Sequence, residues 1–352
     1  MKIYHLISDA EWGSSPRLAL DLCREFISRG HSAEAFTRKT EAIDERFREA
    51  GIGVASLPLR GAFDVVSPVR LSKHLREAPQ GRTVIHTYRM KDAVVAARAR
   101  SLASRPDIRI VLTRLVQRAA KTGASATALY TEIDAFHFPA ECFLTSFMSS
   151  APQIDTGKLH VAATAAALPR STATGGTVRD RDRLRLLTSG HIDSHKGLDT
   201  LVEAMALLAD EDVSLTVLGI GAGPVVMPVI RRSRSLGVAD RIDWRGDASD
   251  LDRSIPDADI AVCPEKATEV KGEEIDAYIA RGIPVVASDT DLYKEIAASG
   301  ADVTLFAAGD AQSLADAVRT ASRKKGERHS PACDRFAGFA DKIEEIYLTL
   351  LR

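Results

Sequence analysis

Two series of short β-type runs, each alternating with amphipathic helical patterns, constrain the fold of this chain more than any other feature of its sequence. In the first series, a predicted strand at residues 2–7 precedes a helical pattern at residues 16–28. In the second, a predicted strand at residues 184–189 precedes a helical pattern at residues 198–209. Because strands that alternate with helices form right-handed βαβ units, the sequence predicts an α/β fold with two doubly wound, Rossmann-like parallel sheets.

The regular pattern breaks between residues 151 and 183, where the composition is typical of an exposed linker. This stretch contains Pro152, Pro169 and a run of serine, threonine and glycine over residues 171–177. At 352 residues, the chain also exceeds the usual size of one domain. We therefore predict a first domain over residues 1–168, a second over 169–335, and a C-terminal helix over 336–352.

Composition and charge disfavour several classes of protein. The net charge of -1 gives no overall field that favours nucleic acid. The four cysteines are scattered, with no Cys-x-x-Cys pair, so we expect reduced thiols rather than disulfides. Charged residues follow the opening apolar run too soon for a signal peptide, and no apolar segment reaches the length of a membrane span. We expect a cytoplasmic protein, with peripheral contact at the inner face of the membrane left open.

Glycine-rich turns follow predicted strands at residues 13–15, 190–197 and 219–223. Backbone N–H groups and helix N-termini at such turns readily face an anion, although a single glycine turn is more often only a tight connection. In the second turn, Lys196 stands at the start of a predicted helix, where its charge and the helix dipole together suit a diphosphate. We recognise no Asp-x-Asp motif of the kind that holds a phosphate-bound metal and no His or Cys ligand spacing, so we predict no metal site.

Four segments of the second half resemble the C-terminal domain of the retaining GT-B glycosyltransferase family 4. They are residues 190–207, 219–224, 236–246 and 257–289. In the first half the resemblance is thinner, and it rests on the opening strand with its glycine loop, the turn Arg29-Gly30-His31 and the strand that ends at His86. The resemblance implies two Rossmann-like domains that face each other across a cleft. The acceptor would lie on the N-terminal side and the nucleotide sugar on the C-terminal side, with the last helix crossing back toward the N-terminal domain.

The same resemblance implies an activity. Such enzymes move a sugar from a nucleotide-diphosphate sugar to a glycan or lipid-linked acceptor, with retention, as in polysaccharide biosynthesis. The resemblance implies neither a metal nor a resident cofactor, and no nucleic acid partner. The base, the sugar, the acceptor and the oligomeric state stay open.

Carried over position by position, the family pattern implies three catalytic residues and several donor contacts. Glu269 falls on the first glutamate of the family motif, near the donor sugar, while Lys196 faces the diphosphate and His86 contacts the donor sugar. The implied donor-binding residues are Gly13, Ser14, His191, Gly221, Gly272, Glu273 and Asp276.

Two of these positions depart from the family pattern. The second motif glutamate, which binds the ribose hydroxyls, is Ala277 here, and an alanine side chain accepts no hydrogen bond. Asp276 precedes it, but on a helix it would point about 100° away. His191 replaces the usual arginine and is mostly neutral near neutral pH, so we expect weaker or pH-dependent donor binding.

Three alternatives to an active transferase remain. One is a divergent, weakly active or inactive homologue that acts as a partner in glycan assembly, which the changes at His191 and Ala277 favour. Another is an enzyme of the same architecture that isomerises or hydrolyses a nucleotide sugar. A dinucleotide dehydrogenase is disfavoured, because neither predicted sheet opens with Gly-x-Gly-x-x-Gly and a later acidic residue.

Overall fold

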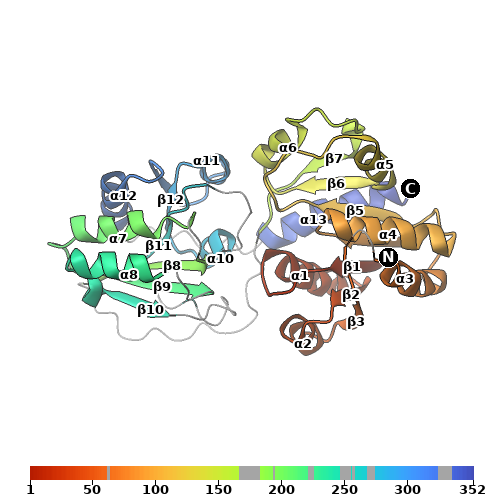
Figure 1. Ribbon diagram of the computed structural model, residues 1–352, viewed down its shortest axis with the longest axis horizontal. Helices are drawn as coiled ribbons and strands as arrows, with labels where there is room; N and C mark the ends of the chain where they lie inside the picture. Colours follow the sequence, from red (N-terminus) through yellow and green to blue (C-terminus); the bar gives the residue numbers. More distant parts are fainter. Residues whose placement is uncertain are drawn as a thin grey trace. The chain divides into compact units, whose positions relative to one another are not determined.

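The structure, a computed structural model, describes residues 1–61, 64–165, 183–192, 195–220, 226–245, 255, 258–267, 274–323 and 335–352. The described residues form two compact α/β units (Figure 1). Unit 1 contains residues 1–164 and 336–352, and unit 2 contains the described residues from 165 to 335. Each unit is built on one parallel sheet covered by helices, so the predicted fold class is confirmed. The predicted boundary between residues 168 and 169 lies outside the described residues.

The sheet of unit 1 has seven described strands in the order β3-β2-β1-β4-β5-β6-β7, all parallel. The strands are β1 (Lys2–Ile7), β2 (Ser32–Arg38), β3 (Gly53–Leu57), β4 (Thr83–Thr87), β5 (Arg109–Thr113), β6 (Ala135–Phe138) and β7 (Leu159–Val161). The helices are α1 (Ser14–Ser28), α2 (Glu41–Glu49), α3 (Val66–Glu77), α4 (Met90–Ala103), α5 (Ala124–Glu132), α6 (Glu141–Met148) and α13 (Arg335–Leu350). The strand order reverses between β1 and β4, which is where open α/β sheets bind ligands.

The sheet of unit 2 has six described strands in the order β10-β9-β8-β11-β12-β13. The strands are β8 (Leu184–His191), β9 (Val213–Ile220), β10 (Ile242–Arg245), β11 (Ile260–Cys263), β12 (Val285–Ser288) and β13 (Val303–Phe306). The helices are α7 (Leu198–Leu207), α8 (Val226–Ser235), α10 (Glu274–Ala280), α11 (Asp291–Ala298) and α12 (Ala311–Arg323). β8 pairs with both β9 and β11, so the strand order of this sheet reverses between β8 and β11.

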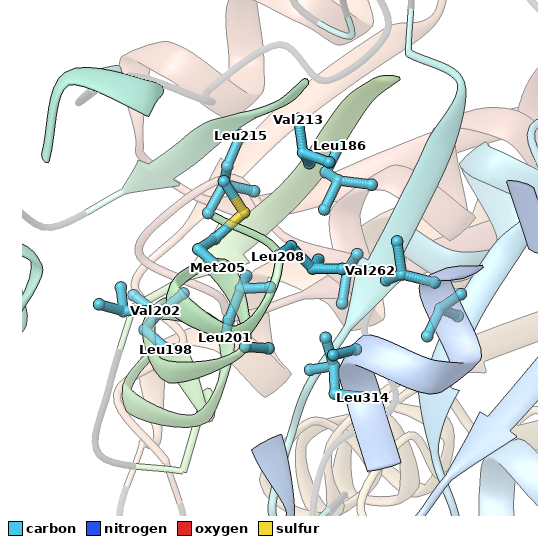
Figure 2. Close-up of a cluster of buried hydrophobic side chains, with 14 of the residues drawn as sticks. Leu186, Leu198, Leu201, Val202, Met205, Leu208, Val213, Leu215, Val262 and Leu314 are labelled. Atoms are coloured by element: carbon cyan, nitrogen blue, oxygen red, sulfur yellow. The ribbon is translucent and has the colours of Figure 1, made fainter. Parts of the chain in front are cut away.

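Apolar side chains hold α7 against the sheet of unit 2 (Figure 2). Leu201 and Met205 lie one helical turn apart on α7 and are fully buried, in the same cluster as Leu215 of β9 and Val262 of β11. Truncating one such side chain to alanine typically costs about 2–5 kcal/mol. The cluster therefore fixes the start of α7, and Lys196 just before it, relative to the strand ends.

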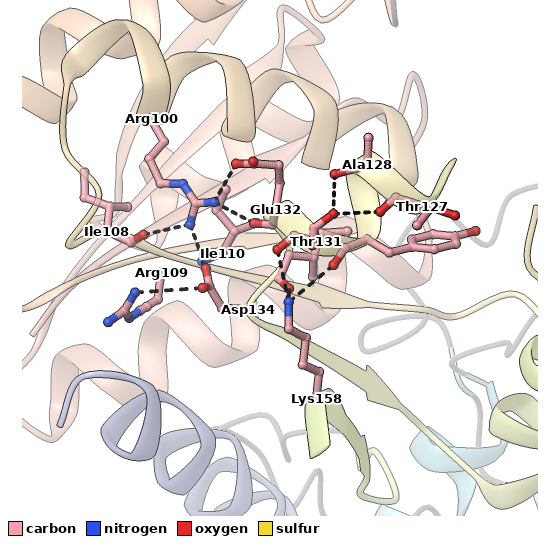
Figure 3. Close-up of polar contacts among 12 residues, drawn as sticks. Arg100, Ile108, Arg109, Ile110, Thr127, Ala128, Thr131, Glu132, Asp134 and Lys158 are labelled. Carbon is pink, nitrogen blue, oxygen red and sulfur yellow. Dashed lines mark hydrogen bonds and ion pairs between the residues drawn. The ribbon is translucent and has the colours of Figure 1, made fainter. Parts of the chain in front are cut away.

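Cations tie helices of unit 1 to the sheet (Figure 3). The guanidinium of Arg100 on α4 donates to the carboxylate of Asp134 (2.8 Å) and to the main-chain oxygen of Glu132 (2.7 Å). The ammonium of Lys158 donates to the main-chain oxygen of Ile133 (2.8 Å), directly after α5. Carbonyl groups at the C-terminal end of a helix lack partners within the helix, and a cation there both satisfies them and offsets the helix dipole.

The last helix, α13, belongs to unit 1. Arg29, directly after α1, forms an ion pair with Glu344 (2.7 Å). Nε of Arg109 on β5 donates to the main-chain oxygen of Leu350 (2.7 Å). Tyr347, on the buried face of the helix, is fully buried. The middle and the C-terminal end of the helix are thus tied to elements from the first part of the chain.

A chain of hydrogen bonds joins buried polar side chains within unit 1. Nδ1 of His86 bonds to the hydroxyl of Tyr347 (2.5 Å), and its Nε2 bonds to the hydroxyl of Thr113 (2.7 Å). The Thr113 hydroxyl also bonds to Nδ1 of His137 (2.9 Å). His5 on β1 stacks on His86 with ring centroids 5.4 Å apart. The three histidines are fully buried, so they form part of the core.

Burial keeps these histidines neutral. Desolvation lowers the pKa of His5 to about 3 and that of His137 to about 4. Desolvation, and secondarily the repulsion that a protonated His5 or His137 would exert, holds the pKa of His86 well below its ordinary value. Asp92, in the first turn of α4, shifts the other way, since burial raises the pKa of its carboxyl to about 7.

We predict that the free energy of unfolding of unit 1 falls as the pH is lowered from about 7 to about 5. Below the ordinary histidine pKa of about 6.5, the unfolded chain takes up protons that the folded histidines exclude, at about 1.4 kcal/mol per pH unit for each histidine. Asp92 takes up one proton in the folded state over the same range and offsets one of the three histidines.

Urea titrations at several pH values, followed by the fluorescence of Trp12 in a Trp244→Phe background, measure this slope. The chain has two tryptophans, and Trp12 lies in unit 1. His86→Gln should make the free energy of unfolding depend less steeply on pH, because one of the three buried histidines no longer contributes. A free energy of unfolding that is constant over this range would contradict the prediction.

Candidate functional site

Several elements of unit 2 end at the carboxyl edge of its sheet, next to the reversal of strand order between β8 and β11. β8 ends at His191, and Pro264 and Glu265 follow directly after β11. Lys196 and Gly197 lie immediately before α7. Carboxyl ends of parallel strands meet at one edge, which is why residues far apart in the sequence gather here.

Lys196 forms a buried ion pair with Glu265. Its Nζ lies 2.5 Å from Oε1 of Glu265, and the side chains are 6% and 16% exposed. Burial alone would lower the pKa of Lys196, but attraction to the carboxylates of Glu265 and Glu274 outweighs burial and raises the pKa above its ordinary value. Lys196 is therefore a charged ammonium inside the edge of the sheet.

Other side chains hold Glu265 in place. The hydroxyl of Tyr293 on α11 donates to Oε2 of Glu265 (2.9 Å). Oγ of Ser288, the last residue of β12, donates to the main-chain oxygen of Glu265 (2.6 Å). Glu265 is not among the residues predicted from the sequence, although an acidic residue shortly after a buried strand is the signal that would have indicated it.

Two glycines allow backbone and carboxylate groups to approach closely at this edge. Gly197 has φ +72°, and a Cβ built there would lie 1.8 Å from the main-chain oxygen of Pro264. Gly190 has φ +115°, and a Cβ there would lie 1.9 Å from Oε1 of Glu274. The carboxylate of Glu274, at the start of α10, therefore lies against the backbone of β8.

Two of the remaining predicted residues of unit 2 are described by the structure, His191 and Asp276. His191 is the last residue of β8. Asp276 lies on α10 and is half-buried, whereas the neighbouring Ala277 is fully buried. A glutamate in place of Ala277 would have to bury its carboxylate, so that substitution should destabilise unit 2. Glu269, Gly221, Gly272 and Glu273 lie outside the described residues.

In unit 1, His86 lies inside the core, whereas Gly13 and Ser14 lie at the start of α1. The family pattern implies that His86 contacts a sugar. In the structure, both ring nitrogens of His86 form hydrogen bonds inside the core, one with Tyr347 and one with Thr113. A structural role explains these contacts. Gly13 and Ser14 stand at the start of α1, and a Cβ at Gly13 would meet nothing within 4 Å.

A second polar cluster, which the sequence analysis missed, lies where β1 and β4 of unit 1 end. Asp9 forms an ion pair with Arg89, and the main-chain N–H of Ser8 donates to Asp92 (3.4 Å). Oδ2 of Asp9 and Oγ of Ser8 are buried and have no hydrogen-bond partner among the described residues. These groups lie at the switch point of the sheet in unit 1.

The described residues contain no group of three or more His, Cys, Asp or Glu side chains placed to hold a metal ion. Within the same part of the chain, no helix is long and apolar enough to cross a membrane.

We predict that Gly197→Ala destabilises the chain more than Gly237→Ala does. Both glycines have φ +72°, so alanine should cost roughly 1–2 kcal/mol of backbone strain at either position. A Cβ at Gly237 meets nothing within 4 Å, whereas at Gly197 it meets the oxygen of Pro264. Thermal unfolding of the two variants tests this, and equal losses would contradict the close approach at Gly197.

Part of this chain is similar to a known protein family. Residues 171–333 match the family Glycosyl transferases group 1. A phosphatidyl-myo-inositol mannosyltransferase of Mycobacterium leprae (strain TN) is 29% identical over 130 residues, which are 36% of this chain and 33% of that protein. The chain thus matches about a third of the length of this relative.

Solved structures resemble the whole chain. A glycosyltransferase from Rickettsia africae ESF-5 matches with a TM-score of 0.80 at 15% identity, over 100% of this chain and 98% of that one. Anabaena Alr3699/HepE in complex with UDP and glucose matches with a TM-score of 0.76 at 16% identity, over 99% and 98% of the two chains. At these identities the likeness establishes the fold alone. Residues 171–333 are therefore similar to the Glycosyl transferases group 1 family, and the chain has the two-domain fold of GT-B glycosyltransferases.

Proposed function

We propose that this chain is a glycosyltransferase that moves a sugar from a nucleotide-diphosphate sugar to a glycan or lipid-linked acceptor, with retention. One observation carries the proposal: the buried ammonium of Lys196 lies directly before α7, at the carboxyl edge of a parallel sheet and beside its reversal of strand order. The match of residues 171–333 to the Glycosyl transferases group 1 family supports it, as do the UDP and glucose bound by Anabaena Alr3699/HepE.

In this proposal the bond between the anomeric carbon and the diphosphate oxygen breaks, a bond from that carbon to the acceptor oxygen forms on the same face, and negative charge grows on the leaving diphosphate. Lys196 and the N–H groups at the start of α7 stabilise that charge, and the diphosphate takes the proton of the acceptor hydroxyl. Removing one such electrostatic donor typically costs about 2.7–4 kcal/mol. Glu269, outside the described residues, keeps its proposed place beside the developing positive charge of the sugar.

The domain roles follow the same proposal. Residues 1–168 would form the acceptor side, residues 169–335 the donor side, and residues 336–352 the returning helix. No resident cofactor or metal takes part, and the enzyme works in the cytoplasm, with peripheral membrane contact where the acceptor is lipid-linked. The proposed donor contacts are Gly13, Ser14, His191, Gly221, Gly272, Glu273 and Asp276.

A second candidate function is a weakly active or inactive homologue that acts as a partner in glycan assembly. Two observations favour it: Lys196 already has an anionic partner in Glu265, and the ribose-binding glutamate of the family is a buried alanine, Ala277. Such a protein would bind nucleoside diphosphates weakly or not at all.

We predict that Lys196→Met weakens the binding of nucleoside diphosphates at least tenfold, about 1.4 kcal/mol, because the only proposed ammonium partner of the diphosphate is lost. Calorimetric titration of the full chain with UDP, ADP and GDP measures this. Lys266→Met is the matched control, since Lys266 is an exposed lysine of the same region that pairs with Asp199.

Thermal unfolding of each variant checks that it is folded. Binding by Lys196→Met that equals binding by the unmodified chain would remove the observation on which the proposed function depends.

A further inference from the structure

Glu265 competes with any bound anion for the ammonium of Lys196. Its Oε1 is 2.5 Å from Nζ of Lys196, and it is the single hydrogen-bond partner of that ammonium among the described contacts. An anion that approaches Lys196 therefore meets a carboxylate already in place.

Hydrogen bonds to neighbouring side chains fix the position of the Glu265 carboxylate. Oε2 accepts from the hydroxyl of Tyr293 (2.9 Å), and Ser288 fixes the main-chain oxygen of the same residue (2.6 Å). The three groups come from the ends of β11 and β12 and from α11, which are rigid elements of one sheet and its cover. A carboxylate held at two oxygens cannot rotate away freely when an anion arrives.

Glu274 adds a second negative charge to the same edge. Its Oε1 lies 1.9 Å from the position that a Cβ of Gly190 would take, and its negative charge raises the pKa of Lys196. The ammonium of Lys196 is therefore paired with the carboxylate of Glu265 and is also attracted by that of Glu274 before any ligand binds. Lys196 therefore attracts a diphosphate less strongly than an ammonium without an internal partner would.

The geometry points to Glu265, together with Glu274, as the group that sets the affinity of this site for diphosphates, by neutralising Lys196 internally. The inference rests on the proposed function, because it takes Lys196 as the partner of the donor diphosphate. It makes Glu265 an affinity-determining residue, which lowers binding of the donor and speeds release of the nucleoside diphosphate product. The opposite role, a carboxylate that positions Lys196 for the diphosphate, predicts the opposite effect of removing its charge.

The decisive variant is Glu265→Gln, which removes the charge, keeps one oxygen to accept from Lys196, and places an amide NH2 that can donate to the Tyr293 hydroxyl. Full-length protein is titrated by calorimetry with UDP, ADP and GDP. We expect Glu265→Gln to bind the preferred nucleoside diphosphate at least tenfold more tightly than the unmodified chain. The gain should disappear in the double variant Glu265→Gln with Lys196→Met.

Asp199→Asn is the matched control. Asp199 lies in the first turn of α7 and pairs with Lys266, so this change removes one carboxylate near the site without touching Lys196. We expect its affinity to stay within about twofold of the unmodified chain, because exposed charges are screened by solvent. A gain as large as that of Glu265→Gln would show a general charge effect and overturn the specific role of Glu265.

The remaining outcomes separate this inference from the proposed function. Unchanged or weaker binding by Glu265→Gln, with binding by the unmodified chain intact, overturns the inference and leaves the proposed function standing. No binding of any of the three nucleotides by either protein overturns both. If Glu265→Gln does not fold, Glu274→Gln decides in its place, and tighter binding supports the inference while unchanged or weaker binding overturns it.

Discussion

Parallel pairing of β8 with both β9 and β11 is the constraint on which the candidate site depends. It sends the carboxyl ends of these strands to one edge and reverses the direction of the crossover connections there. The start of α7 is fixed against the same strands by the buried cluster around Leu201 and Met205. Lys196, just before α7, and Glu265, just after β11, therefore lie next to each other at this edge. Gly197 allows the backbone before α7 to approach the main-chain oxygen of Pro264 closely.

The chemistry of that edge follows from burial. An ammonium that is almost fully buried requires a counter-charge, and removal of one partner from a buried pair costs far more than the pair itself contributes. Glu265 meets this requirement inside the protein, so the positive charge on Lys196 is stabilised before any ligand arrives. A site of this kind exchanges one anionic partner for another, and its affinity depends on the difference between the two.

In unit 1, the surroundings of a histidine side chain decide whether it can bind a ligand or is part of the core. From the sequence, His86 at the end of a strand is indistinguishable from a ligand-binding histidine. In the fold, α13 returns to unit 1 and brings Tyr347 to Nδ1 of His86, while Thr113 takes Nε2. Polar groups that lie at the switch point of this sheet, among them Asp9 and Asp92, carry no recognisable spacing in the sequence because they come from different strands and helices.

The sequence by itself determined the α/β class, the two series of strands, and the position of Lys196 at the start of a helix. These features depend on periodicity, glycine and helix starts, which are properties of neighbouring residues. Only the tertiary structure decided which carboxylate pairs with Lys196, since Glu265 is 69 residues away in the sequence. It also decided which hydroxyl bonds to Nδ1 of His86, since Tyr347 is 261 residues away. Contacts at such separations are set by strand order and by where a returning helix packs, and no local pattern encodes either.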